Sequence, residues 1–236
     1  MSDPKLSIGT RKESSLHRSL KFQYSGTGGS IEYAASSYVC DAITEDGELI
    51  EVQTGSFGPL KEKIKKLTKE NRVKIIHPII NLKKIELYNA EGELIRSRKS
   101  PIKGKNWDLF DALVYAPLLP KIKNLSIELA IVDIIEKRID DGTGSWRRKG
   151  VRIIDRVLEY WHSSLILKKP KDYLQFVPFA GKECFTVTEM AKKSGMKREM
   201  AQKAIYVLVK MQLLEKTGKK GRAFVYKVKG TKKKQG

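Results

Sequence analysis

Residues 40–54 constrain the fold most, because their pattern predicts a β-hairpin that carries an acid in each strand. Two mainly apolar runs flank a Glu-Asp-Gly turn at 45–47. If Gly47 takes the left-handed position of a three-residue loop, Asp41 falls directly opposite Glu51. Directly opposed residues share one face of a sheet. A two-residue turn would instead put the two acids on opposite faces.

With the three-residue loop, one face carries Asp41, Glu51 and Gln53 among apolar neighbours. Both faces of the hairpin are mainly apolar, so we expect the sheet to be covered on both sides and the acids to be partly desolvated. Unpaired buried carboxylates are costly, and a hard cation such as Mg²⁺ offsets that cost through oxygen ligands. The residues therefore predict a metal site at Asp41 and Glu51. The alternative is that both acids lie at an open sheet edge, in water or paired with lysines.

The chain is strongly basic, with a net charge of +20 over 236 residues. Residues 180–236 hold 16 Lys and Arg against 4 Asp and Glu, so more than half of the excess lies in about a quarter of the chain. Such a concentration favours a polyanionic partner, bound through phosphate contacts. We expect nucleic acid, with double-stranded DNA first; charge alone leaves RNA open.

Other partners and cofactors are disfavoured by composition. No window approaches eighteen uncharged apolar residues, so no membrane partner is expected. The first residues lack the apolar core of a signal peptide, which predicts a cytoplasmic, nucleoid-associated protein. Cys40 and Cys184 are too few and too far apart for a zinc site. Oligomeric state stays open, with a homodimer as one option.

Helical and strand patterns alternate over the first third of the chain and predict an α/β core at 10–80. Its expected elements are a helix over 11–24, a strand over 31–34, hairpin strands over 38–44 and 48–54, a helix over 60–70 and a strand over 73–80. Thr10 and Glu13 fit a capping box at the first helix.

Residues 81–179 predict an α+β middle extension and linker. Its expected elements are a hairpin over 82–105 with its turn at 89–92, a helix over 107–115, strands over 125–137 and 151–167, and a helix from 170. The run Trp146-Arg147-Arg148-Lys149 could stack on a base and clamp phosphates. A partly buried tryptophan beside a basic turn is the alternative.

Residues 180–230 predict a winged helix-turn-helix, followed by a basic tail at 231–236. A capping box at Thr186 and Glu189 opens a helix, a turn at 194–196 ends it, and a longer helix follows over 197–211. Strands over 213–217 and 223–228 form the basic hairpin. Helix, glycine turn, helix and basic hairpin in this order are typical of a winged helix.

Basic and amide side chains on this module predict its DNA contacts. On the longer helix they lie outside the apolar stripe, and on the hairpin they surround the turn. They are Lys197, Arg198, Gln202 and Lys203 on the helix, and Lys219, Lys220 and Arg222 on the hairpin. Gln202 is the candidate base reader, because glutamine can pair bidentately with adenine. The alternative is a winged helix used for protein contacts.

Asp41, followed ten positions later across the hairpin by Glu51-Val52-Gln53, resembles the motif of the PD-(D/E)xK nuclease superfamily, with glutamine in place of the final lysine. The resemblance covers residues 10–80 and implies a restriction-endonuclease-like mixed sheet flanked by helices. It implies that Asp41 and Glu51 are metal ligands, with the Val52 carbonyl as a third. Gln53 stands where the family's lysine acts, and Lys61 or Lys63 could reach in instead. Glu13 is in the place of a helix-borne catalytic acid, although capping also explains it.

The whole layout also resembles uncharacterised bacterial proteins that join this core to a C-terminal winged helix. We therefore expect a Mg²⁺-dependent DNA endonuclease, with Mn²⁺ as an alternative ion, whose catalytic residues are Glu13, Asp41, Glu51 and Gln53. The alternative is a catalytically inactive, nuclease-fold DNA-binding regulator. An RNA-processing factor is a third interpretation.

Overall fold

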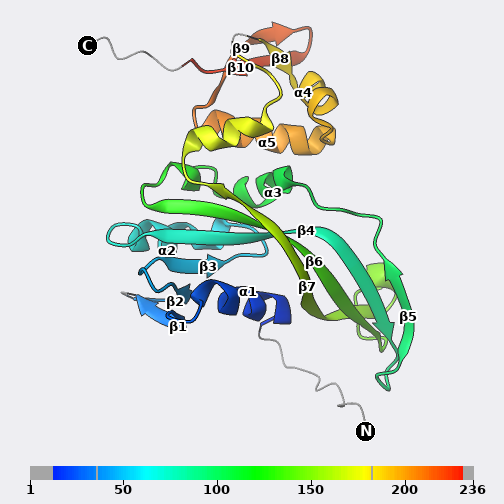
Figure 1. Ribbon diagram of the computed structural model, residues 1–236. Helices are drawn as coiled ribbons and strands as arrows, with labels where there is room; N and C mark the ends of the chain where they lie inside the picture. Colours follow the sequence, from blue (N-terminus) through cyan, green and yellow to red (C-terminus); the bar gives the residue numbers. More distant parts are fainter. Residues whose placement is uncertain (1–12, 36, 182, 231–236) are drawn as a thin grey trace.

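The structure is a computed structural model that describes residues 13–35, 37–181 and 183–230, except for the side chain of Arg148. Within this part of the chain, seven strands form one mixed sheet in the order β1-β2-β3-β4-β6-β7, with β5 paired to β4 (Figure 1). The strands are β1 (Ser30–Ala35), β2 (Tyr38–Ile43), β3 (Leu49–Val52), β4 (Val73–Tyr88), β5 (Leu94–Lys99), β6 (Leu125–Asp140) and β7 (Val151–Leu167). The sheet is flanked by helices, which confirms the expected α+β class with a large mixed sheet.

The β2–β3 hairpin has the predicted register. Its ladder pairs are Ala42 with Ile50 and Ile43 with Leu49. Gly47 takes the left-handed conformation, with φ of 77°. Its N–H donates to the carbonyl oxygen of Thr44. The three-residue loop is therefore confirmed, and the two-residue turn is wrong.

Helix α2 (Lys61–Leu67) covers one face of the sheet. It connects β3 to β4, and these two strands run parallel, as do β4 and β6. A short 3₁₀ turn, η1 (Gly58–Leu60), leads into the helix, where Pro59 suits a helix start. Ile64 and Leu67 are buried in the main core, which also takes in Leu49 and Ile75.

Helix α1 (Ser15–Ser25) covers the other face. Leu16 and Leu20 are buried in a second core together with Ile50 and Ile76. The helix begins later than the expected residue 11, because the side chain of Ser14 accepts the His17 N–H and caps it. The prediction that Glu13 forms part of a capping box inside the helix is therefore wrong, because Glu13 lies before the Ser14 cap. The other member of the predicted box, Thr10, lies outside the described residues.

Strands β4, β6 and β7 run past the helical layers and form a long, twisted extension of the sheet (Figure 1). The expected boundary between residues 80 and 81 falls inside β4, so the core and the middle extension share one sheet. Bulges beside Ile80, Ile131 and Asp133 shift the ladder at this point. Bulges interrupt the two-residue alternation of apolar residues and increase the local twist. For this reason the sequence pattern of one continuous strand predicts two separate segments.

The remaining middle elements follow the sequence with shifted ends. The turn at 89–92 is confirmed between β4 and β5, with Gly92 at φ of 87°. The helix expected over 107–115 is a 3₁₀ turn, η2 (Asn106–Asp108), followed by α3 (Leu109–Leu113). The helix expected from 170 is the 3₁₀ segment η5 (Pro170–Phe176).

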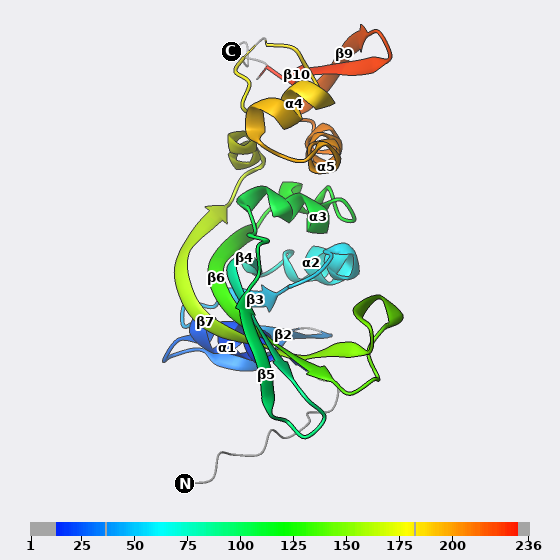
Figure 2. The same cartoon turned by 90° about the vertical axis from the view of Figure 1, so that its right-hand side faces the viewer.

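The last module contains two helices and a small antiparallel sheet. Helix α4 (Val187–Ser194) opens with the predicted Thr186–Glu189 capping box and ends at Gly195. Helix α5 (Arg198–Lys210) follows, and the strands β8 (Phe185–Thr186), β9 (Leu214–Lys220) and β10 (Ala223–Val228) pair in the order β8-β10-β9. Helix α5 lies against α3 of the sheet domain (Figure 2). Both modules share one continuous core, which includes Phe110, Phe176 and Val207.

Candidate functional site

The β2–β3 ladder ends at the two acids singled out in the sequence. Its last described pair is Ala42 with Ile50. Beyond this pair, the N–H of Val52, two residues past Ile50, donates to Oδ2 of Asp41, one residue before Ala42, at 2.8 Å. The Asp41 carboxylate therefore takes the place of a backbone acceptor, in the gap between the two strands. This position differs from the predicted one, in which Asp41 stood on the same face as Glu51.

Helix α1 supplies the other partners of Asp41. His17 Nε2 lies 3.1 Å from Oδ2, and Lys21 Nζ lies 3.2 Å from Oδ1. Burial by itself would raise the pKa of Asp41, but the hydrogen bonds from His17 and the Val52 N–H, together with the charge of Lys21, hold it below its usual value. Asp41 is therefore held as a carboxylate at neutral pH.

Lys21 is a buried cation, only 7% exposed. Its Nζ lies 2.9 Å from Oε1 of Glu13 and 3.8 Å from Oε1 of Glu32, in addition to Asp41. Burial would lower the pKa of Lys21, but the neighbouring Glu13 and Asp41 carboxylates raise it overall. His17 and Lys21 lie four residues apart on one side of α1, and Glu13, just before the helix, contacts both. Such spacing was the sequence signal for Lys21, which our motif-based prediction missed.

Glu51 faces the opposite helical layer. It is 4% exposed, and its carboxylate forms an ion pair with Lys63 of α2. Lys63 also donates to the Val39 carbonyl oxygen at 2.7 Å. Burial, with the nearby charge of Asp41 adding to it, raises the pKa of Glu51 even though Lys63 opposes the shift. Burial, together with the charge of the Glu51 carboxylate, raises the pKa of the Cys40 thiol to about 12.

Gln53 turns away from the acids. Its Nε2 donates to the carbonyl oxygen of Ser56 at 2.7 Å, which ties it to the turn that precedes α2. Its own carbonyl oxygen lies 2.6 Å from Nδ1 of the buried His77. Of the two lysines considered as substitutes, Lys63 contacts Glu51, whereas Lys61 is exposed.

The site contains carboxylate oxygens that could hold a divalent cation. Asp41 and Glu51 offer hard oxygen donors, the type that Mg²⁺ prefers. The Oε1 atoms of Glu51 and Glu13 are buried without a hydrogen-bond partner, although each lies against a lysine. In the described part of the chain, no group of three or more His, Cys, Asp and Glu side chains is arranged to hold a metal ion. The oxygen donors are of the type that suits a divalent cation, but Asp41 and Glu51 face opposite helical layers and each already pairs with a lysine.

The predicted DNA-contact residues of α5 divide into two groups. Lys197, Arg198 and Gln202 are exposed. Lys203 instead reaches toward the sheet domain, where its Nζ lies 2.6 Å from Oδ1 of Asp111 in α3. It serves the contact between the modules, because α5 lies on α3.

The β9–β10 hairpin keeps its basic tip in solvent. Lys219, Lys220 and Arg222 are all exposed. Lys220 pairs with Glu189 of α4 at 3.3 Å, and Lys219 lies 5.2 Å from the ring centre of Phe224. Of these cations, Lys219 therefore lies near the exposed ring of Phe224, which Lys216 also contacts.

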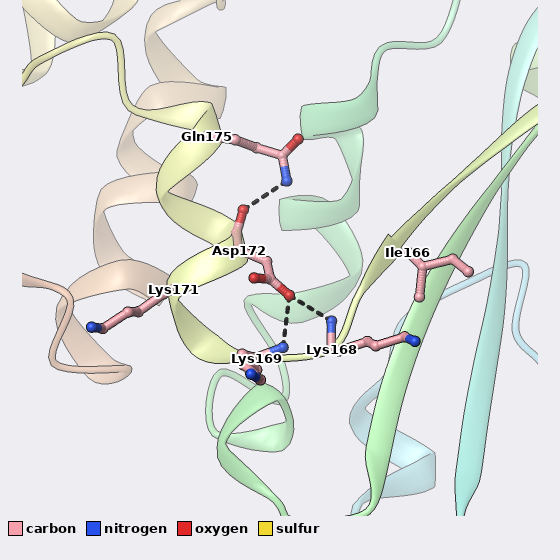
Figure 3. Close-up of a pocket in the computed structure, with 6 residues that line it drawn as sticks. All are labelled: Ile166, Lys168, Lys169, Lys171, Asp172 and Gln175. Atoms are coloured by element: carbon pink, nitrogen blue, oxygen red, sulfur yellow. Dashed lines mark hydrogen bonds between the residues drawn. The ribbon is translucent and has the colours of Figure 1, made fainter.

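A surface pocket lies where β7 passes into η5 (Figure 3). It is lined by Ile166, Lys168, Lys169, Lys171, Asp172 and Gln175. Oδ2 of Asp172 accepts the backbone N–H groups of Lys168 and Lys169, and Gln175 donates to the Asp172 carbonyl oxygen (Figure 3). These bonds cap the 3₁₀ segment between the two modules, so we assign the pocket a structural role.

Comparison with known proteins gives a family but no activity. The family described as "Domain of unknown function (DUF8091)" matches residues 14–168. An uncharacterized protein of Treponema pallidum (strain Nichols) is 31% identical over 153 residues, which is 65% of this chain, and the match spans 61% of that relative. No solved structure matches the chain significantly. Among the described residues, no helix has the length and apolar character needed to cross a membrane. The family match covers more than half of this chain, so the chain belongs to the DUF8091 family.

Proposed function

We propose that the chain is a DNA-binding, nuclease-like protein that hydrolyses phosphodiester bonds with Mg²⁺ at the site formed by α1, β2, β3 and α2. One observation carries this proposal. The Asp41 carboxylate lies in the gap between β2 and β3, one residue along the ladder from the buried Glu51, and a lysine reaches Glu51 from α2. The pKa values of Asp41 and Glu51 are shifted in opposite directions, and shifted pKa values cluster at functional sites.

Each residue of the site has a proposed role. Asp41 and Glu51 would hold the metal ion, which when bound acidifies water and stabilises charge on phosphate oxygens. His17 and Lys21 orient Asp41 and keep it ionised. Lys63, which pairs with Glu51, would supply the positive charge that Gln53 lacks.

The C-terminal module would bring duplex DNA to this site as a winged helix. Support comes from the exposed Arg198 and Gln202 on α5 and from the exposed Lys219 and Arg222 on the β9–β10 hairpin. Arginine and lysine contact phosphates and set orientation, while glutamine can read adenine in the major groove. The contact of α5 with α3 joins this module to the sheet domain.

A nicking assay tests the activity. Wild type should convert supercoiled plasmid to open circles in Mg²⁺ or Mn²⁺, and chelation should stop the reaction. Asp41→Ala and Glu51→Gln should reduce the rate at least 100-fold. Glu62→Gln, an acid that is exposed on α2, serves as the matched control and should leave it unchanged.

The second candidate is a DNA-binding regulator without catalysis. It is favoured by the ion pairs that already compensate Asp41 and Glu51, and by the hydrogen bond that holds Gln53 at Ser56. Tight, salt-dependent binding of duplex DNA by the wild type, with no cleavage in either metal, would establish this function instead. Absence of DNA binding would reject both candidates.

A further inference from the structure

The loop between β6 and β7 presents Trp146 to solvent. This side chain is 83% exposed and lies in a one-turn 3₁₀ segment, η4 (Trp146–Arg148). The loop joins the far ends of two long paired strands, well away from the β9–β10 hairpin (Figures 1 and 2). Neither the sheet core nor the proposed catalytic site uses this loop.

Hydrogen bonds give the loop a defined shape. The Gly144 N–H donates to the Gly150 carbonyl oxygen at 2.7 Å, which closes its base. Asp141 accepts from Thr143 and from Arg152 Nε at 2.8 Å. These bonds, with the turn at Thr143, hold the pKa of Asp141 down at about 2, so its carboxylate stays ionised and keeps these partners.

Close backbone packing restricts the loop further. A Cβ atom on Gly144 would lie 2.2 Å from the Val151 carbonyl oxygen, so only glycine fits there. Lys149 adopts the left-handed conformation, with φ of 51°, and its N–H donates to the Trp146 carbonyl oxygen. A pre-shaped loop loses little conformational freedom when it binds a partner. The loop therefore holds Trp146 in a defined position before any partner binds.

The neighbours of Trp146 define the chemistry of that partner. The Arg147 guanidinium lies 5.5 Å from the centre of the Trp146 ring, and Lys149 is exposed beside them. An open aromatic face next to cations matches a nucleobase next to its phosphates. Base–aromatic stacking tolerates any base, because every base has a π face.

We propose that this loop, defined by residues 141–152, binds unpaired bases of DNA, with Trp146 stacked on a base and Arg147 and Lys149 on the flanking phosphates. Base faces are covered inside a continuous duplex, so the loop selects tails, branches or gaps. This inference rests on the proposed DNA-binding function and narrows its substrate class to DNA that combines duplex with unpaired bases.

Binding of the full chain to two DNA molecules tests the inference: a plain duplex, and the same duplex with a single-stranded tail. Wild type should bind the tailed DNA more tightly. Trp146→Ala should weaken binding to the tailed DNA about 10-fold and leave duplex binding unchanged, whereas Trp146→Phe should retain most of the affinity. Tyr160→Ala removes a ring that is 59% exposed on β7 and serves as the matched control, with no expected change.

Tryptophan fluorescence provides a second readout. Tailed DNA should quench the emission of wild type, and Trp146→Phe should lose that quenching. If Trp146→Ala binds both DNAs as wild type does, the inference is wrong while DNA binding stands; altered self-association in sedimentation would then assign the loop to a protein contact. If wild type binds neither DNA, the inference and the proposed function both fail.

Discussion

The Asp41 carboxylate accepts the Val52 N–H at 2.8 Å, so a side chain replaces a backbone acceptor between β2 and β3. The described backbone pairing of these strands ends at Ala42 and Ile50, and the ionised Asp41 carboxylate bonds to the strand at Val52 instead. His17 and Lys21 compensate Asp41 from α1, and Lys63 compensates Glu51 from α2. Side chains from both helical layers therefore form ion pairs with acids at the same end of the β2–β3 ladder.

Asp41→Asn should lower stability at neutral pH and remove part of its acid dependence. The pKa of Asp41 is depressed below 3.8, so its contribution is present above that value and is lost as pH falls through the folded-state pKa. Asparagine can still accept from Val52, so we expect a loss of about 1–2 kcal/mol at pH 7. Urea unfolding between pH 3 and pH 7 measures it. Equal acid sensitivity in wild type and variant would contradict this assignment.

Glu51→Gln should change the pH dependence of stability in the opposite direction to Asp41→Asn. The pKa of Glu51 is raised above 4.5, so its favourable contribution is present below that value and is lost as pH rises through the folded-state pKa. Relative to Glu51→Gln, wild type should therefore lose free energy of unfolding between pH 4.5 and pH 7. A difference that stays constant over this range would show that the glutamate titrates normally.

Lys21→Met should be destabilising, because it removes a buried cation from the partly buried carboxylates of Asp41 and Glu13. Breaking a buried ion pair from one side costs about 3–5 kcal/mol. Lys65→Met removes the exposed pair with Glu62 and is the control, expected to change stability by less than about 1 kcal/mol. Chemical unfolding at pH 7 compares the two. Similar small effects for both would mean that Lys21 is better hydrated than its 7% exposure indicates.

Arg222→Ala and Lys219→Ala should each weaken binding to any duplex and reduce the salt dependence of affinity by about one phosphate contact. Lys203→Ala should have a smaller effect, because this lysine pairs with Asp111 of α3. Fluorescence anisotropy over a series of salt concentrations gives the slopes. A larger effect at Lys203 than at Arg222 would put the DNA on another surface.

The register of the β2–β3 hairpin could be predicted from the sequence, because the position of Gly47 fixes the loop and the loop fixes the pairing. The orientation of Asp41 could not. Strict alternation put it beside Glu51, but the carboxylate entered the ladder to accept the Val52 N–H. The alternation of apolar residues holds no information on such a side-chain bond to the backbone.

The long sheet extension was also divided wrongly. The bulges in β4, β6 and β7 interrupt the two-residue period near residues 80 and 133, so one sheet read as a core plus an extension. The C-terminal module was predicted more closely, since its capping box and the glycine at 195 mark its helix ends directly. Contacts between distant segments, such as Lys203 with Asp111 or Lys63 with Glu51, depend on packing that local patterns do not specify.

The most direct test of the proposed site compares single-turnover DNA cleavage in Mg²⁺ by wild type, Lys63→Met and Lys65→Met. Both lysines are on α2, but only Lys63 contacts Glu51; Lys65 pairs with Glu62 at the surface. We predict that wild type and Lys65→Met cleave at the same rate and that Lys63→Met is at least 100-fold slower, as for loss of a group that stabilises developing charge. Equal rates for all three proteins, or no cleavage by wild type, would contradict the account.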